Sequence, residues 1–477
     1  MIFDGIVNWV REWVNKMIST VDIKRVLGVE PDISDPMVSA LRIWTQMYEN
    51  KSSWLISDEI ESLNLAAAIA SEIANICTIE MKVRIEGGAR ADYLTEQLEK
   101  VINQISTTVE YGAAKGGIIF KPYPTEKNIS VDFIQADQFF PIKFDPNGNI
   151  QSCVFVDQLK IGDKTYTRLE LHDLQKGGIY VVTNTAFKSS SKGTLGTEVS
   201  LTEVPEWENL LAKATLKGVK KPLFAYFRYP LANTVDTNSP LGVSCFSRSV
   251  DLIQQADEQW SMLLWEMDSG KRALYLDELA FGKDSDGKPV LPNKRLYRTL
   301  NNASDKIGDE EFFREWSPEL RQTDILAGLN AILKKIEFTS CIAYGTLSDL
   351  QLIDKTATEI KVSKQRTYST VVSVQKTLSD TLDNLLYAMD AWATLGSLAA
   401  KGAYTVTYDF DDSVLVDKDK QIEQELRLVT QGIMSNIEFR MRNMGEDEDT
   451  AKKMVALAIT QRKAEQAEQN IFEDKNI

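Results

Sequence analysis

The chain has 477 residues, of which 43% are hydrophobic and 26% are charged, so we expect two or three folded globular domains. The formal net charge of −15 argues against a regulator that holds duplex DNA tightly through a basic patch. No apolar run approaches the roughly 20 residues of a membrane span and no signal peptide is recognisable, so we expect a cytosol-like compartment.

The N-terminal part of the chain is predicted to be helical. Residues 2–18 (IFDGIVNWVREWVNKMI) crowd their apolar side chains on one side of a helix, which we expect to pack against protein rather than a membrane. Further helices are predicted from Ser57 to Thr78 and from Arg90 to Glu110, followed by a glycine break at Gly112–Gly117. The AAKGG stretch in this break lacks the pattern of a phosphate-binding loop, so we expect a close approach of backbone segments there.

Residues 117–187 are predicted to form a meander of strands. Their alternating, β-branched and aromatic segments are IIFK, ISVDFI, FFPIKF, SCVFVDQL, YTRLELHDL and IYVVTNTAF. The turns at Asp145–Gly148 and Lys176–Gly178 suit hairpins. Residues 188–196 are expected to be a flexible loop. Asn233 and Asp236 lie in a Pro/Asn/Ser-rich region, where turn formation is favoured over metal binding.

Two predicted helices, Val243–Met267 and Gln322–Phe338, flank a segment of different character. Residues 271–318 contain the strand-like ALYLDEL and KRLYRTL and a tight turn that begins at Asp284. This DSDG turn lacks the spacing and closing glutamate of a calcium loop, so it predicts a hairpin turn. A loop, Ala343 to Lys355, with Gly345 as its hinge, follows the second helix.

The run from Thr356 to Leu395 organises the chain, because it contains no glycine or proline and predicts one helix of about 60 Å. Spacings of three and four place its apolar residues on one stripe: Tyr368, Val371, Val372, Leu378, Leu382, Leu385, Leu386, Met389 and Trp392. Its first half is basic and its second half acidic. A strand at 403–410 and two amphipathic helices, Lys418–Asn443 and Asp447–Glu468, complete the prediction.

The order of helix, loop and very long helix resembles the portal proteins of tailed bacteriophages, in particular those of phages with Gram-positive hosts. The succession of helix, strand, GG, RADYLTEQLE, YGAAKGG and VDFIQADQFFPIKFD extends the resemblance over most of the chain. It implies an α+β subunit with a mixed α/β wing, a helical stem, a small β clip, a long central helix and a helical crown. The implied divisions are 1–242 (N-terminal region and wing), 243–270 and 319–342 (stem helices), 271–318 (clip), 343–355 (tunnel loop), 356–416 (long helix and return strand) and 417–477 (crown).

The resemblance also implies a function and its residues. We expect a ring of about twelve copies at one capsid vertex, through which double-stranded DNA is packaged and ejected without sequence-specific contact. Expected partners are the large terminase subunit, head-completion or adaptor proteins, and capsid and scaffolding proteins, with the protein in host cytoplasm during assembly and in the virion afterwards. The tunnel-loop candidates are Thr346, Leu347, Ser348, Asp349, Leu350 and Gln351. Candidate channel-facing bases are Lys334, Lys335 and Lys355, and candidate clip contacts are Lys283, Lys288, Lys294, Arg295 and Arg298.

Two other function classes stay open on the sequence. A ring-forming helical adaptor or scaffold without DNA passage would share the helices. A carboxylate-dependent enzyme could use pairs such as Asp132 with Asp137 or Glu170 with Asp173, although these lie on ordinary strands and turns without a cofactor motif. We expect no enzyme, cofactor or metal.

The cysteines and the single histidine support that expectation. The four cysteines, scattered with no CxxC pair, are expected to be buried free thiols: Cys77, Cys153, Cys245 and Cys341. The single histidine, His172, excludes HExxH and Cys2His2 zinc sites and is expected to be a strand residue.

Overall fold

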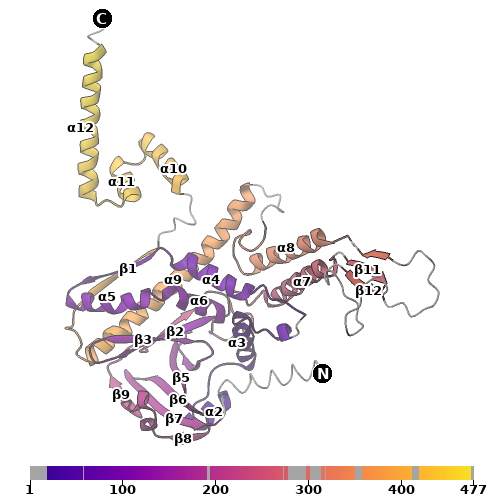
Figure 1. Cartoon of the computed structure of the whole chain (residues 1–477). Coiled ribbons are helices and arrows are strands. Elements are labelled where there is room, and N and C mark those ends of the chain that lie inside the picture. The colour runs from indigo at the N-terminus through magenta and orange to yellow at the C-terminus, as the bar shows by residue number, and fades with distance from the viewer. Residues whose placement is uncertain are drawn as a thin grey trace, which may run out of the picture. The chain divides into compact units, whose positions relative to one another are not determined.

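The computed structural model describes residues 19–56, 59–190, 194–271, 273–277, 297–300, 313–316, 319–349, 357–410 and 418–473. The chain forms two compact units, Met1–Asp409 and Phe410–Ile477, and its fold is α+β, as the sequence predicts (Figure 1). None of the helices in the described ranges is both long and apolar enough to cross a membrane. The helix predicted for residues 2–18 lies outside the described residues.

Helices make up most of the N-terminal part of the first unit. Their bounds are α2 (Thr20–Leu27), α3 (Asp35–Tyr48), η1 (Ser53–Ile56), α4 (Leu65–Thr78), α5 (Ala89–Ile102) and α6 (Ile105–Lys115). Helix α4 begins at Leu65, later than the predicted Ser57, because the segment before it is bound to another helix. The backbone N–H of Leu63 donates to Asp257 Oδ1 at 2.8 Å, so this segment runs along that helix and does not close turns of its own.

The helix predicted from Arg90 to Glu110 is in fact two helices, since the chain turns at residues 103–104. The predicted glycine break is also too early, because α6 continues through Gly112 and ends before Gly116. The expected close approach of backbones is confirmed at Gly116. A Cβ on Gly242 would lie 1.9 Å from the Gly116 carbonyl oxygen, so only glycine fits at this contact.

All six predicted strands between residues 117 and 187 form, but they divide between two sheets. One sheet has the order β10-β2-β3, with β2 (Gly117–Pro124), β3 (Ile129–Gln135) and β10 (Ala225–Arg228) all antiparallel. The other has the order β4-β5-β6-β7-β8, and β9 also pairs with β7. Its strands are β4 (Phe139–Phe144), β5 (Ile150–Ile161), β6 (Lys164–Gln175), β7 (Ile179–Ser189), β8 (Thr197–Val199) and β9 (Lys213–Lys217). Hairpins β4–β5 and β6–β7 close at the two predicted turns.

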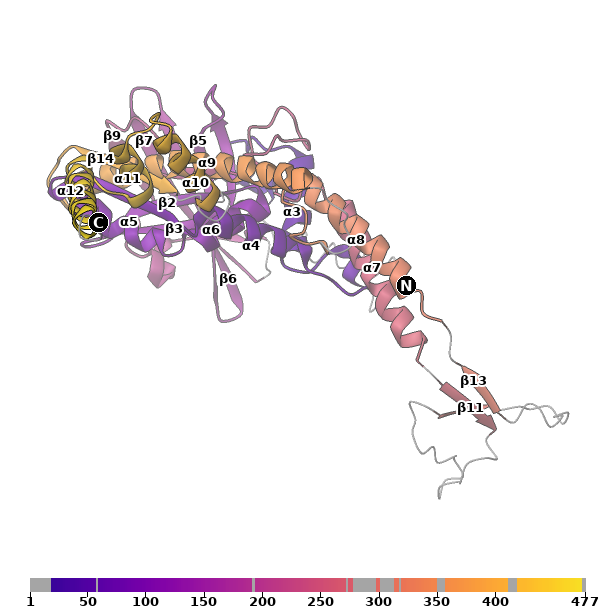
Figure 2. The same ribbon diagram turned by 90° about the horizontal axis from the view of Figure 1, so that it is seen from above.

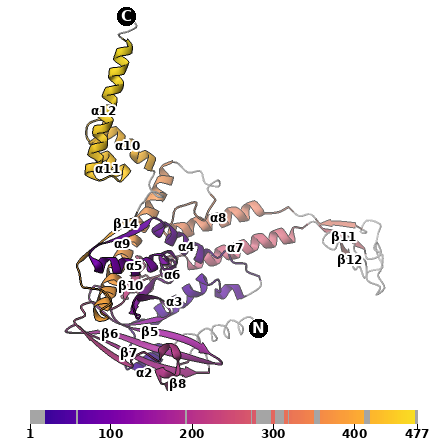
Figure 3. The same cartoon turned by 60° about the vertical axis from the view of Figure 1, so that its left-hand side comes forward.

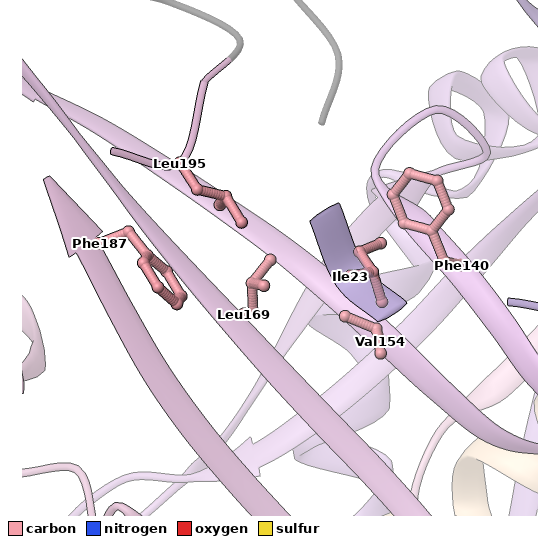
Figure 4. Packing of buried hydrophobic residues seen from close by; sticks show 6 residues of the cluster. All are labelled: Ile23, Phe140, Val154, Leu169, Phe187 and Leu195. Carbon is pink, nitrogen blue, oxygen red and sulfur yellow. The ribbon is translucent and has the colours of Figure 1, made fainter. Parts of the chain in front are cut away.

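One face of the larger sheet packs under α2. The buried residues of this core alternate along the strands with residues of the opposite face, and Figure 4 shows Ile23 lying over the side chains of the sheet. The members of the core are Ile23, Phe140, Val154, Leu169, Phe187 and Leu195. Short η2 (Leu201–Glu203) and η3 (Pro205–Trp207) lie between β8 and β9 in the chain.

Two antiparallel helices, α7 (Val250–Ser269) and α8 (Gln322–Thr339), lie side by side and extend away from the sheets (Figures 1 and 2). Helix α7 starts at Val250 and not at the predicted Val243, because residues 243–249 form turns whose side chains enter the core; Phe246 is 0% exposed. Between the helices, β11 (Ala273–Asp277) pairs parallel with β12 (Tyr297–Leu300) and antiparallel with β13 (Phe313–Trp316). The turn predicted at Asp284 lies outside the described residues.

Helix α9 (Ala357–Leu395) has 39 residues and confirms the predicted long helix. Most of its predicted stripe is buried from Val371 onward and Trp392 is half-buried, but Tyr368 and Val372 are 37% and 40% exposed. The fully buried members are Leu378, Leu382, Leu385, Leu386 and Met389. The helix packs against β2 and β10. The strand predicted at 403–410 forms as β14 (Tyr404–Phe410) and pairs with β1 (Met81–Gly87).

The second unit contains α10 (Lys418–Thr430), α11 (Asn436–Met444) and α12 (Glu448–Glu473). The predicted first helix, Lys418–Asn443, is wrong as a single element, because the chain turns at Gly432 with a φ of +73°. Ser435 then caps α11, its hydroxyl oxygen accepting from the Glu438 N–H at 3.0 Å. The left-handed backbone conformation at Gly432 is incompatible with a continuous α-helix, so α10 ends before it.

Candidate functional site

The candidate site is the module of α8, the following loop and α9, and its least expected feature is a buried carboxylate. Glu337 is 0% exposed and lies in the last turn of α8. Its Oε1 accepts the backbone N–H groups of Gly345, Leu347 and Ser348 at 2.9, 2.7 and 2.8 Å. Its Oε2 accepts the Ser348 hydroxyl at 2.8 Å. One carboxylate therefore satisfies four donors of the loop, an arrangement suited to a negative charge.

A second side chain of α8 extends this anchor. Asn330 is 7% exposed, and its Oδ1 accepts the backbone N–H of Asp349 at 2.8 Å. Together, Glu337 and Asn330 fix the loop from residue 345 to residue 349 against the helix that precedes it. No pattern in the sequence predicts this role, because the donors are backbone groups that every loop carries.

The end of α8 is a tight reversal. The Ile342 N–H donates to the Glu337 carbonyl at 3.0 Å and the Cys341 N–H to the Phe338 carbonyl at 3.4 Å, the bond pattern of a Schellman motif. Cys341 occupies the left-handed position of this motif with a φ of +59°. Glycine is the usual residue there because a Cβ is disfavoured in this conformation. The predicted hinge, Gly345, also has a positive φ of +89°.

The tunnel-loop candidates differ in their exposure to solvent. Thr346 and Asp349 are exposed, whereas Ser348 is 5% exposed and bound to Glu337. Ser348 is therefore placed to anchor the loop and not to contact a ligand. Leu350, Gln351 and Lys355 lie outside the described residues.

The two candidate bases of α8 have different surroundings. Lys335 is exposed, and its Nζ lies 5.3 Å from the centre of the Phe338 ring, while Lys334 is half-buried. Arg366 of α9 covers the same ring at 4.4 Å. Phe338, which is 45% exposed, thus joins a cation from each helix of the module, and such contacts are worth about 0.5–1 kcal/mol at exposed sites.

Helices α7 and α8 are tied at both ends. Near one end the Ser249 hydroxyl lies 2.9 Å from the Ser340 hydroxyl. At the other end Arg321 donates to Glu266 through its backbone N–H at 3.1 Å and through its guanidinium at 2.9 Å. The second tie lies beside the 271–318 insertion, so it holds together the two points where that insertion leaves and rejoins the helices.

A buried carboxylate on α7 braces this pair against the N-terminal part of the chain. Asp257 is 2% exposed and accepts the Trp54 indole N–H at 3.0 Å as well as the Leu63 backbone N–H. Burial raises the pKa of Asp257, and the two hydrogen bonds oppose that effect.

The clip candidates are mostly beyond the described ranges. Lys283, Lys288, Lys294 and Arg295 lie outside the described residues. Arg298 is in β12, opposite Tyr275 of β11.

The carboxylate pairs of the enzyme alternative have separate partners. Asp137 accepts from Lys115 at 2.8 Å, and Glu170 accepts from Lys121 at 2.6 Å and lies 2.8 Å from His172 Nε2. Burial alone would raise the pKa of Glu170, but Lys121, His172 and Arg168 outweigh it and hold that pKa well below its usual range. Glu170 is therefore ionised, and Asp137 and Glu170 are each paired with a lysine. Among the described residues no group of three His, Cys, Asp or Glu side chains could hold a metal ion.

His172 is a strand residue of β6, as predicted. Its Nδ1 lies 2.8 Å from the Tyr180 hydroxyl, and that hydroxyl accepts the Leu223 backbone N–H at 3.2 Å. Tyr180 therefore donates to Nδ1, and Nε2–H donates to Glu170. Burial lowers the pKa of His172 although the neighbouring Glu170 opposes the shift, so the ring is neutral near pH 7.

The cysteine prediction is confirmed at three positions and wrong at one. Cys77, Cys153 and Cys245 are buried free thiols, but Cys341 is only half-buried. Burial raises the pKa of the Cys77 and Cys245 thiols to about 12. These two thiols stay protonated near neutral pH and are poor nucleophiles.

Comparisons with known proteins give one family. A family model described as "Phage portal protein, SPP1 Gp6-like" matches residues 67–470. No curated protein matches the chain. Among solved structures, one titled "Neck of native GTA particle computed with C12 symmetry" matches with 11% sequence identity and a TM-score of 0.42, over 86% of this chain and 94% of that chain.

Proposed function

The chain belongs to the SPP1 Gp6-like family of phage portal proteins, and from this premise we propose that it forms a ring of about twelve copies at one capsid vertex. Double-stranded DNA passes through this ring during packaging and ejection. The single observation that carries the proposal is the α8–loop–α9 module, in which one buried carboxylate fixes the loop between the two helices.

The loop between α8 and α9 is fixed at its first residues, which suits a loop that lines a channel. Residues 345–349 are bound to α8 by Glu337 and Asn330, so the position of the rest of the loop is set by the helix. We propose that residues 346–351, apart from the anchor Ser348, point into the channel and that Lys334, Lys335 and Lys355 face it. A few local bases in a chain with a net charge of −15 would guide DNA without holding it.

The paired helices suit the role of a stem that carries a docking element. We propose that α7 and α8 line the channel below the wing and that the 271–318 insertion is the clip. The bonds of Glu266 to Arg321 support this division, because they close the neck of the insertion. Clip contacts through Lys283, Lys288, Lys294, Arg295 and Arg298 would then bind the large terminase subunit and, later, head-completion proteins.

The remaining assignments follow from the same proposal. Residues 1–242 with β14 form the wing, α9 spans the subunit, and residues 417–477 form the crown. Capsid and scaffolding proteins contact the ring during assembly in the cytoplasm of a Gram-positive host, and the mature protein is part of the virion. Catalysis has no place in this role, and ATP hydrolysis belongs to the terminase.

Packaging by capsids that contain altered rings tests the proposal. Proheads are assembled with the wild-type protein, with residues 347–352 deleted, or with the same six positions replaced by glycine and serine. We expect rings in all three cases and a loss of DNase-protected genome-length DNA in the deletion. Folded monomers that no longer assemble, or full packaging without the loop, would contradict the placement of the loop in the channel.

A further inference from the structure

The α/β part of the first unit contains a cleft of about 1170 Å³ that the module described above does not use. It is lined by β2 and β3, by residues 206–211, by Trp392 of α9 and by β5 and β6 of the larger sheet. The sheet residues that line it, such as Phe155 and Arg168, alternate with the core residues under α2. The cleft therefore opens on the sheet face opposite that helix, and Figure 3 shows the strands concerned.

The floor of the cleft is a network of buried charges. Lys121 is 5% exposed and contacts Glu170 at 2.6 Å, and Arg168, which is 8% exposed, contacts Glu170 at 3.2 Å and Asp157 at 3.2 Å. A buried ionic network is costly to desolvate and seldom stabilises a fold more than apolar packing would. Charges kept at the floor of a cleft are instead typical of a binding site.

Three polar atoms in the lining are buried without a hydrogen-bond partner. Two are donors, Arg168 Nε and Trp392 Nε1, and one is an acceptor, Asp137 Oδ1. Buried polar groups are nearly always paired. These three atoms are closed to water, so a ligand of this cleft reaches them only when their side chains shift, and it would then supply both acceptors and a donor. A polypeptide backbone offers this combination, because each residue carries a carbonyl and an N–H.

The charged and aromatic residues that line the cleft indicate which side chains a bound segment should carry. The lining holds two cations, Lys121 and Arg168, and five carboxylates: Asp132, Asp137, Asp157, Glu170 and Glu206. With Lys115, which pairs with Asp137, three cations face five carboxylates, an excess of two negative charges. This excess disfavours phosphates and nucleic acid and favours a basic side chain. The aromatic walls favour an apolar neighbour; they are Tyr123, Phe133, Phe155 and Trp207.

We propose that this cleft binds a short extended segment of a partner protein in which an arginine or lysine stands beside an apolar residue. The backbone of the segment pairs with the unsatisfied groups, and its basic side chain lies at the half-buried Asp132 and the exposed Glu206. The proposal does not depend on ring formation or on the path of DNA, so it stands or falls separately from the proposed function.

Fluorescence polarisation of a labelled peptide on the purified full chain tests the proposal. The probe is fluorescein-Gly-Leu-Arg-Leu-Gly, and the matched control carries glutamate in place of arginine. We expect saturable binding of the arginine peptide that weakens with added salt, and none of the glutamate peptide. Absence of saturable binding, or equal binding of both peptides, would overturn the proposal.

Variants locate the binding in the cleft. Asp132→Asn and Glu206→Gln should each weaken it by about two- to fivefold, the range of exposed ion pairs, whereas Asp163→Asn in an exposed turn should leave it unchanged. Trp392→Phe keeps an aromatic side chain and removes the unpaired indole N–H, so we expect peptide affinity to fall about fivefold. Wild-type affinity in all three cleft variants would overturn the placement.

A polyamine is the competitor that separates the two sources of positive charge. Spermidine carries amines but no carbonyl, so it should displace the labelled peptide far less well than the unlabelled peptide does. Displacement by spermidine at equal concentrations would assign the cleft to small cations and overturn the peptide proposal.

Discussion

Glu337 holds the first part of the loop between α8 and α9, so removing its carboxylate should release that segment. In Glu337→Ala, three backbone N–H groups lose their acceptor at a position that is 0% exposed to water. A hydrogen bond to a charged group is worth about 1.5–3 kcal/mol, and bonds to one group are not additive. We therefore expect the free energy of loop opening to fall by about 3–5 kcal/mol.

Two further variants should lower the free energy of loop opening by smaller amounts. Glu337→Gln keeps one carbonyl oxygen for the backbone donors but loses the charge and the second acceptor, so a loss of about 1–2 kcal/mol is expected. Ser348→Ala removes the bond that its hydroxyl donates to Glu337 and the long 3.3 Å bond that it accepts from the Gly345 N–H, for about 1 kcal/mol. Asp324→Ala, an exposed carboxylate in the first turn of the same helix, is the control.

Hydrogen exchange read by mass spectrometry is the assay. Peptides that span residues 340–349 should exchange about a hundredfold faster or more in Glu337→Ala, less in Glu337→Gln, and at the wild-type rate in Asp324→Ala. Unchanged exchange at residues 345–348 in Glu337→Ala would refute the reasoning, because the carboxylate would then not be what orders the loop.

Three other changes test the fold. Because burial lowers the pKa of His172, the unfolded chain takes up a proton below about pH 6.5 that the folded chain does not. The free energy of unfolding should therefore fall as the pH drops from 7 to 5.5, and His172→Gln, which removes the single histidine, should flatten this dependence; an unchanged slope would contradict it. Cys341→Gly should raise the free energy of unfolding, measured by urea denaturation, by about 1 kcal/mol, since the left-handed conformation disfavours a Cβ. A lower free energy of unfolding in this variant would show that Cys341 is not strained. Leu382→Asp with Leu386→Asp should prevent folding, because buried unpaired charge costs several kcal/mol; Ser373→Asp on the exposed face is the control, and a soluble, unchanged double variant would show that the stripe is not buried.

Features with a local physical cause could be predicted from the sequence. The strands between residues 117 and 187 and the long helix α9 follow from periodicity, and the hairpins follow from their turn residues. The close approach at Gly116 was indicated by the paired glycines. These elements carry their own pattern, so no knowledge of neighbours is required.

Features set by tertiary contacts could not be predicted. Helix α4 begins late because Leu63 is bound to Asp257, which is 194 residues further along the chain. The anchor at Glu337 was missed because its partners are backbone amides. Exposure of Tyr368 and Val372 was missed because periodicity shows which residues share a face, and only the fold shows where the neighbours of that face end.

Imaging of the purified assembly tests the central claim most directly. Size-exclusion chromatography with light scattering, followed by electron microscopy of the main peak, measures the copy number and the central opening. We expect a closed ring of about twelve copies with a channel of roughly 20 Å or more, wide enough for a duplex. A monomer or dimer at every salt concentration, or a ring without an opening of that width, would contradict it.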